Sequence, residues 1–165
     1  MAELTTNINY LQPTAFKLVI DRKKFGNLEY FAQTVSHPEV NITAAEIPFR
    51  RVNLHVAGDK LTYGTLSARI IVDENMQSYT EIYDWVQRLV TENNTTRSIV
   101  VDEEFPTAVD ITVSILNSQN NQVKAIRYID CVPTDVGGIE FEATTQDVQF
   151  LTFNVTFQFS YFKVV

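Results

Sequence analysis

The segment at the C-terminal end of the chain constrains the fold more than any other feature. Residues 151–161 alternate strictly, with Thr, Asn, Gln or Ser separating six apolar positions: Leu151, Phe153, Val155, Phe157, Phe159 and Tyr161. A period of two predicts one β-strand with a buried face and a polar face. At about 3.3 Å per residue it would span roughly 35 Å, and so long a strand exposes unpaired backbone groups unless its sheet closes. We therefore expect a β fold that closes within the chain or is completed by neighbouring chains.

The preceding sequence supplies the other strands of this sheet. Residues 109–115 alternate cleanly and run into the turn-forming stretch 117–121, after which 123–131 returns, so 107–131 is predicted to be a hairpin. Arg127 shares the parity of apolar neighbours, which indicates a β-bulge or burial on both faces. Further strands, bounded by Pro and Gly punctuation that includes Ile47-Pro48, are expected at 15–20, 28–34, 41–46, 49–55 and 66–72.

A single amphipathic helix is predicted over residues 78–92. Ser78-Tyr79-Thr80-Glu81 has the form of a capping box, in which Ser78 and Glu81 each satisfy a backbone amide at the helix start. Apolar residues follow at helical spacing: Ile82, Trp85, Val86, Leu89 and Val90. Together these segments predict a mainly β fold, an antiparallel β-sandwich or barrel of about seven or eight strands with one flanking α-helix. The length of 165 residues predicts a single domain over 1–165.

Charge and cysteine content exclude several classes of function. The chain has 13 basic and 20 acidic residues, a net charge of −7, which is the opposite of a DNA-binding domain or a polybasic membrane-docking surface. No uninterrupted apolar run exceeds three residues, so no membrane-spanning helix is expected, and residues 1–7 lack the basic and apolar parts of a signal peptide. Cys131 is the only cysteine, which excludes an intrachain disulfide and a cysteine-based zinc site.

Residues that could carry catalysis are few. His37 and His55 are isolated, and no Gly-x-Ser-x-Gly elbow marks a nucleophile. The acidic triplet at 102–104 lacks the spacing of a calcium site and is expected to be a solvated loop. Trp85 and Cys131 fall at core positions. We therefore predict that the protein is not an enzyme and has no catalytic, cofactor or metal site.

Three ordered segments resemble the tail tube proteins of contractile-tailed, T-even-like bacteriophages. The first, His55-Val56-Ala57-Gly58-Asp59-Lys60, is similar to the family's Val-Ala-Gly-Asp-Arg/Lys loop. The second is the strand to Asp73 with the following helix, which contains the family's Asp-Trp pair at Asp84-Trp85. The third, 132–137 before the final strand, is similar to its Pro-Thr-x-x-Gly turn, although Val132 stands where the family often has an aromatic residue. The likeness extends over about 16–162, and 1–12 and 93–105 match no known segment.

The resemblance implies a structural virion protein without catalysis. Its subunits would assemble into hexameric rings that stack into the inner tail tube, the conduit for DNA and the tape measure protein during ejection. The implied partners are further copies of the chain, the tail sheath protein, the baseplate or tube initiator and the tail terminator. The protein would belong to the virion and assemble in the host cytoplasm, and its extended loop at about 37–63 would reach the adjacent ring.

The resemblance also indicates which residues would form interfaces. For ring stacking they are His55, Ala57, Gly58, Asp59 and Lys60. For continuation of the sheet between subunits they are a turn with Pro133, Thr134 and Gly137, together with the last strand. The polar face of that strand would then line a wet lumen, and a neutral or acidic wall would let DNA slide without specific binding.

Other functions stay open. A baseplate-proximal tube initiator shares this domain but forms single rings, and type VI secretion and extracellular contractile injection systems have related inner tubes. Outside these structural proteins, the sequence is compatible with a monomeric ligand-binding β-sandwich or a hydrolase dependent on His37 or His55. Self-assembly into rings or tubes separates the first group from the second.

Overall fold

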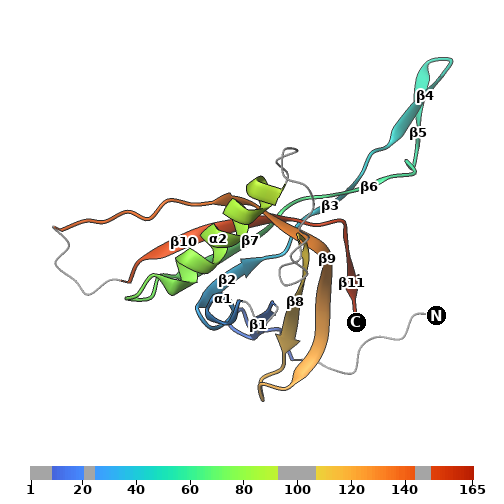
Figure 1. Ribbon diagram of the computed structural model, residues 1–165. Coiled ribbons are helices and arrows are strands. Elements are labelled where there is room, and N and C mark those ends of the chain that lie inside the picture. Colours follow the sequence, from blue (N-terminus) through green and yellow to red (C-terminus); the bar gives the residue numbers. More distant parts are fainter. Residues whose placement is uncertain (1–8, 21–24, 93–106, 144–149) are drawn as a thin grey trace.

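The computed structural model describes residues 9–20, 25–92, 107–143 and 150–165 (Figure 1). Two helices occur in these ranges, α1 (Gly26–Tyr30) and α2 (Gln77–Glu92). The strands are β1 (Phe16–Val19), β2 (Ala32–Ser36), β3 (Val40–Ile42), β4 (Ala45–Phe49), β5 (Val52–Val56), β6 (Leu61–Tyr63), β7 (Leu66–Ile71), β8 (Val109–Leu116), β9 (Gln122–Val136), β10 (Thr152–Gln158) and β11 (Tyr161–Val164). The predicted mainly β fold with one long flanking helix is confirmed. The acidic triplet at 102–104 lies outside the described residues.

One seven-stranded antiparallel sheet forms the body of the protein. Its strand order is β1-β8-β9-β10-β7-β2, and β11 also pairs with β9. Strand β9 organises this sheet, because β8 runs along one of its edges while β10 and β11 follow one another along the other. Within the described residues, the end strands β1 and β2 each pair with a single strand. Among the described residues the outer edges of β1 and β2 are therefore open, as is that of β11, which the argument from unpaired edges anticipates.

The predicted single strand over 151–161 is broken at Ser160. Phe153, Val155 and Phe157 point into the core as expected, but beyond the break it is Phe162, not Tyr161, that packs against the core. Tyr161 is 39% exposed. The opposing strand β9 changes face at the same level, where Asp130 adopts a left-handed backbone conformation with φ of 55°. Both strands thus skip one residue together, which leaves their pairing intact and rotates the following side chains to the other face.

Helix α2 covers the apolar face of the sheet, and its cap differs from the prediction. Trp85 is buried and stacks on the Phe25 ring at 4.7 Å. The capping box is wrong, because Glu81 accepts hydrogen bonds from the Asn27 side chain and the Leu28 amide instead of reaching back to the helix start. Asp73 takes the capping role, since its Oδ1 accepts from both the Ser78 amide and the Ser78 hydroxyl at 2.9 Å.

The strand predicted over 28–34 is also wrong in its first half. Residues 26–30 form the short helix α1, and strand β2 begins only at Ala32. Leu28 is fully buried, and its amide bonds to Glu81 of α2. A contact across 53 positions therefore decides the conformation of this segment over its local pattern.

Residues 37–64, here called the arm, project away from the body as a long antiparallel ribbon (Figure 1). Strands β3 and β6 pair near the body, and β4 and β5 pair further out. The sequence predicted an extended loop here with two strands, but it placed their turn at Ile47-Pro48. The turn lies at Arg50-Arg51, where Arg50 has φ of 54°, and Pro48 is inside β4 opposite Asn53. On this two-stranded ribbon Pro48 has only one partner strand, a position that proline tolerates.

Candidate assembly surfaces of the arm and the sheet

The outer part of the arm has one apolar face that the described body leaves uncovered. Directly opposed residues of two strands share a face, and three such pairs are apolar on both sides: Ala45 with Val56, Ile47 with Leu54, and Phe49 with Val52. These six residues are called the apolar face of the arm. Its five larger side chains are 46–65% exposed. A strip of this kind is typical of a protein–protein contact rather than of a free surface.

The opposite face and the tip of the arm are polar. Glu46 and His55 are cross-strand neighbours whose side chains approach within 3.7 Å, and Asn53 donates a hydrogen bond to Glu46. At the tip, Arg50 lies over the Phe49 ring at 5.7 Å. His55 is therefore an exposed residue of the arm, paired with a carboxylate and remote from any described nucleophile. The arrangement suits an interface and not general base catalysis.

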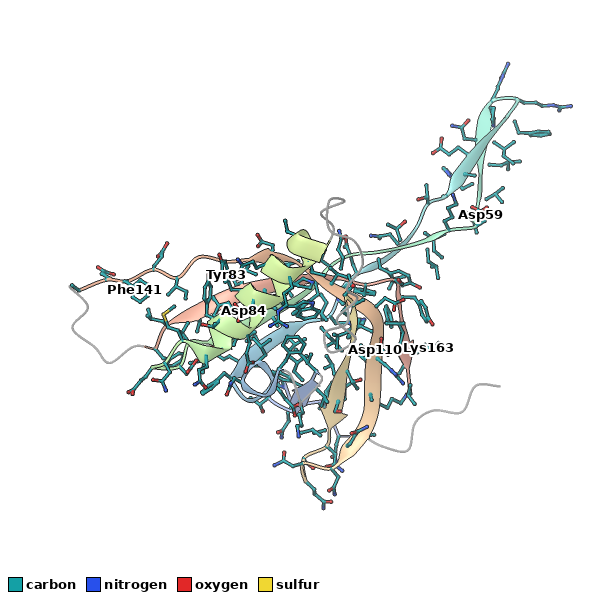
Figure 2. All side chains as sticks on the ribbon, in the orientation of Figure 1. Asp59, Tyr83, Asp84, Asp110, Phe141 and Lys163 are labelled. Carbon is teal, nitrogen blue, oxygen red and sulfur yellow. The ribbon has the colours of Figure 1, made fainter. Side chains whose placement is uncertain are left out.

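The stretch 57–60 connects the outer and inner parts of the arm, as Figure 2 shows around Asp59. Gly58 has a specific steric role here, because a Cβ atom at this position would lie 1.8 Å from the carbonyl oxygen of Thr43. Only glycine permits this approach of the two backbones. His55, Ala57, Gly58, Asp59 and Lys60 thus all lie on the arm. Their part in ring stacking remains a prediction.

Five aromatic rings join the arm to the body. His37 precedes β3 and Tyr63 ends β6, so these two residues form the base of the arm. Both rings contact Phe162, with centroid distances of 5.0 and 5.4 Å. Phe159 and Tyr128 complete the group, and the Tyr128 hydroxyl lies 2.6 Å from Nδ1 of His37. We call these five residues the basal cluster.

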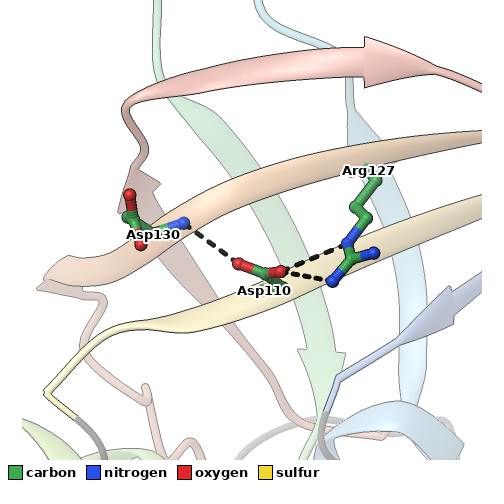
Figure 3. Close-up of polar contacts among 3 residues, drawn as sticks. All are labelled: Asp110, Arg127 and Asp130. Atoms are coloured by element: carbon green, nitrogen blue, oxygen red, sulfur yellow. Dashed lines mark hydrogen bonds and ion pairs between the residues drawn. The ribbon is translucent and has the colours of Figure 1, made fainter.

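The change of strand face beside the basal cluster is held by a polar network (Figure 3). Asp110 of β8 accepts from Nη2 and Nε of Arg127 at 2.7 and 3.1 Å, and its other oxygen accepts from the Asp130 amide at 3.2 Å. Ser160 donates its hydroxyl to the Asp130 carboxylate at 3.3 Å. Sequence reasoning missed this network, yet the sequence contained a signal. The irregular parity of Arg127 indicated a bulge or burial on both faces, and β8 and β9 do shift register between Val109 and Ile111.

The third predicted interface segment is not a turn. Pro133 and Thr134 lie inside β9, where Pro133 is buried opposite Phe157 and Thr134 donates its hydroxyl to the Thr156 carbonyl. Gly137 follows the strand and donates its amide to the Asn154 carbonyl at 2.7 Å. The Pro-Thr pair lies in a strand because β10 pairs with β9 on both sides of it, at Asp135 and at Pro133, with a β-bulge at Thr134 that the local sequence did not reveal. The residues are therefore positions of the sheet, and an interface at Pro133 would be indirect.

The face of the sheet opposite the core is lined by small polar side chains. Its cross-strand neighbours include Asn154 with Arg69, Thr156 with Ser67 and Ser36 with Ser67. Asn154 and Arg69 are exposed and joined by a hydrogen bond of 3.4 Å. Within the described residues α2 lies on the other side of this sheet, through Trp85 and Phe157. The polar face of the last strand is thus available to solvent or to a channel.

Titratable groups of the body offer little chemistry. Burial raises the pKa of the Cys131 thiol to about 12, helped by the nearby carboxylates of Asp110 and Asp130. Burial likewise raises the pKa of Tyr128 well above its usual value. In the described ranges no three His, Cys, Asp or Glu side chains gather as a metal site would require. An open cleft of about 650 Å³ lies between the edge strands β1 and β2 and helix α1, where Lys17 pairs with Glu29 at 3.5 Å.

Among the described residues, no helix has the length and apolar character needed to cross a membrane.

Comparison with known proteins agrees with this architecture. The chain is 29% identical over 137 residues to the tail tube terminator protein of Enterobacteria phage T4, covering 81% of this chain and 76% of the relative. Its fold matches the tube-terminating cap of the anti-feeding prophage, with a TM-score of 0.69 at 12% identity over 99% of this chain and 95% of that one. It also matches the sheath–tube complex of an extracellular contractile injection system, with a TM-score of 0.68 at 15% identity over 99% of both chains.

The sequence profile of the phage tail tube protein family matches residues 3–165. Because this match spans almost the whole chain, the protein belongs to the phage tail tube protein family and is a structural tail component, not an enzyme.

Proposed function

We propose that the protein forms a hexameric ring that continues the inner tail tube and ends it, as a tube terminator. The observation that carries this proposal is the apolar face of the arm, whose five larger side chains form one exposed strip. Fully burying an exposed Val, Leu, Ile or Phe side chain contributes roughly 1.5–3 kcal/mol, and these side chains are 46–65% exposed, so a neighbour that covers this face gains about half of that figure for each of them. The arm therefore suits docking onto an adjacent ring, with His55–Lys60 as the connecting segment of the contact.

The relatives support the end of the tube over its shaft. A tail tube terminator from phage T4 is 29% identical to this chain over 137 residues, and a tube-terminating cap has the same fold. The sequence alone suggested the main tube protein, with identical rings stacked along the tail, and the shared fold with a sheath–tube complex keeps that as the second candidate. The two differ in one property, because a terminator docks on a tube of another protein whereas a main tube protein docks on itself.

Ring formation follows from the open edges of β1 and β2. An edge strand presents unpaired backbone groups, and a head-to-tail contact between such edges closes into a ring when its rotation divides evenly. The polar sheet face with Asn154, Thr156 and Gln158 would line the lumen, through which DNA and the tape measure protein pass. A lumen wall without a basic stripe holds DNA weakly. Replacing Asn154 and Gln158 by Lys is expected to slow ejection, and an unchanged ejection rate contradicts this assignment of the lumen.

The proposed partners are further copies in the ring, the adjacent tube ring, and the tail sheath protein on the outside. The baseplate or initiator complex lies at the far end of the same tube. The protein would be assembled in the host cytoplasm and remain in the virion. Each of these partners follows from a position at the head-proximal end of a contractile tail.

Negative-stain electron microscopy of the purified protein tests the proposal. A terminator is expected to form single rings alone and to cap tubes when mixed with the tube protein of the same phage. Long tubes from this chain alone would assign it to the shaft instead. A monomer that neither forms rings nor binds tube ends, at high concentration, contradicts both assignments.

A further inference from the structure

We propose that the C-terminal strand β11 positions the arm, acting through Phe162. In this view β11 holds the two roots of the arm in one orientation, so that the apolar face of the arm is presented in a fixed direction. The inference rests on the proposed docking role of the arm and adds the part of the body that controls it. Phe162 is here a positioning residue, because it contacts the roots of the arm and not the neighbour that the arm binds.

The first argument is that, among the described residues, the arm contacts the body at its base. The rings of His37 and Tyr63, one at each root of the arm, contact the Phe162 ring edge-to-face, with centroid distances of 5.0 and 5.4 Å. The two roots are tied to each other by the hydrogen bond from the Gly64 amide to the Glu39 carbonyl, at 2.9 Å. Every residue from 39 to 57 is exposed. The direction of the arm relative to the body therefore depends on a few contacts at its base.

The second argument is that Phe162 reaches the arm only because the strands change face. In an unbroken strand Phe159 and Phe162, three positions apart, would point to opposite faces. The break at Ser160 instead brings both rings into the basal cluster, 6.3 Å apart. The network of Asp110, Asp130 and Ser160 stabilises this break. As a result, the Phe159 and Phe162 rings both contact residues at the roots of the arm.

The third argument is that β11 is a short strand with a single partner strand. It has four residues and, among the described strands, pairs only with β9. Tyr161, Lys163 and Val164 are exposed along it. Short elements with few buried contacts open with low free energy, independently of the rest of the fold. When β11 opens, Phe162 leaves the roots of the arm and the arm loses its fixed direction.

Distances between spin labels test this inference on the full-length protein. Labels at Arg50→Cys, on the tip of the arm, and Gln119→Cys, in the exposed β8–β9 turn, report the direction of the arm relative to the body. Every labelled protein also carries Cys131→Ala, so that the two introduced cysteines are the only thiols that can react. We expect a narrow distance distribution in the otherwise unsubstituted protein, a distribution at least twice as wide in Phe162→Ala, and a narrow one in Phe162→Tyr, which keeps the ring.

Tyr161→Ala is the matched control, since it changes the neighbouring residue of the same strand outside the basal cluster and should leave the distribution narrow. Should Phe162→Ala fail to fold, the pair His37→Ala with Tyr63→Leu removes the same contacts from the arm side and must also widen the distribution. A narrow distance distribution in the folded Phe162→Ala or in this pair overturns the inference.

Docking onto tube ends should fall at least ten-fold in the variants whose distance distribution is widened, and unchanged docking overturns the functional part of the inference. The spin-label distances are measured on the protein alone, without a tube. A failure of the proposed docking function can therefore be distinguished from a failure of this inference.

Discussion

The hydroxyl of Tyr128, in the centre of the sheet, lies 2.6 Å from Nδ1 of His37 at the base of the arm, 91 positions away in the chain. Tyr128 is fully buried, and burial raises its pKa, so the phenol stays neutral at physiological pH and needs a hydrogen-bond partner. His37 supplies that partner from a segment that is otherwise exposed. The bond ties the orientation of the arm to the packing of the core.

This hydrogen bond predicts a non-additive effect on stability. His37→Ala leaves the Tyr128 hydroxyl buried without a partner, which should lower the free energy of unfolding by about 1–3 kcal/mol. Adding Tyr128→Phe removes the orphaned hydroxyl and should recover most of that loss. Urea unfolding of the two single variants and the double variant measures the coupling. Equal stability of His37→Ala and the parent protein would show that the bond contributes nothing.

Gly58 predicts a local defect of the arm. In Gly58→Ala the new Cβ would meet the Thr43 carbonyl, so β5 and β6 must shift relative to β3. We expect faster amide hydrogen exchange in the arm and weaker docking onto tube ends, with body stability changed by less than about 0.5 kcal/mol because the arm adds little to the core. Gly138→Ala is the control, since no atom lies within 4 Å of its added Cβ. Arm exchange as slow as in the parent would contradict the steric argument.

The two faces of β5 predict opposite outcomes for neighbouring substitutions. Leu54 lies on the apolar face of the arm and Asn53 on the polar face. Leu54→Asp should weaken docking at least ten-fold, because a charge replaces an apolar side chain worth roughly 1.5–3 kcal/mol when buried. Asn53→Asp should have little effect on docking, and both variants should melt near the parent temperature. Sedimentation or microscopy of mixtures with tubes measures docking, and equal effects of the two variants would exclude the apolar face as the contact.

Asp73 predicts a pH dependence of stability. Burial alone would raise its pKa, but hydrogen bonds from the backbone amides of Ser78 and Gln77 and from the Ser78 hydroxyl outweigh it and lower the pKa below 3.8. The resulting stabilisation is present above pH 3.8 and is lost as the pH falls through the lower value of the folded protein. Asp73→Asn should therefore be less stable than the parent by about 0.3–1 kcal/mol at neutral pH, and the difference should disappear in acid.

Thermal unfolding between pH 2 and pH 7 measures this difference for Asp73→Asn. Glu74→Gln removes the adjacent carboxylate, which accepts neither hydrogen bond from Ser78, and serves as the control. A difference between parent and Asp73→Asn that persists unchanged at pH 2 would mean that the charge of Asp73 is not its source.

Cys131 predicts the accessibility of the core. Its thiol is fully buried and its pKa is raised to about 12, so a thiol reagent at pH 8 should leave the native protein unmodified and react at once in denaturant. Substitutions in the basal cluster that open β11 should increase the native rate, since Cys131 adjoins Asp130 at the change of strand face. Rapid native modification of the parent protein would contradict a closed core.

Local periodicity was sufficient for most strands and for α2. The alternation around Phe153 and Val155 and the helical stripe through Ile82 and Trp85 each state which side chains are buried, because the repeat of a strand or helix is a property of the backbone itself. In the arm the sequence predicted strands but placed the turn at Ile47-Pro48, whereas it lies at Arg50-Arg51.

Other features required contacts that no local pattern contains. Helix α1 forms where Leu28 meets Glu81, and Asp73 displaces Glu81 as the partner of Ser78. The change of strand face needs Asp130 and Ser160 to shift together on two different strands.

The sequence by itself determined the class of the fold, the amphipathic helix and, through ordered motifs, the family. Only the tertiary structure decided that the arm exposes one apolar face and that its base is held by Tyr128 and Phe162. The physical reason is the sequence separation over which each effect acts. Backbone periodicity acts over a few neighbouring residues, whereas register, strand edges and hydrogen-bond partners are chosen among segments many tens of residues apart.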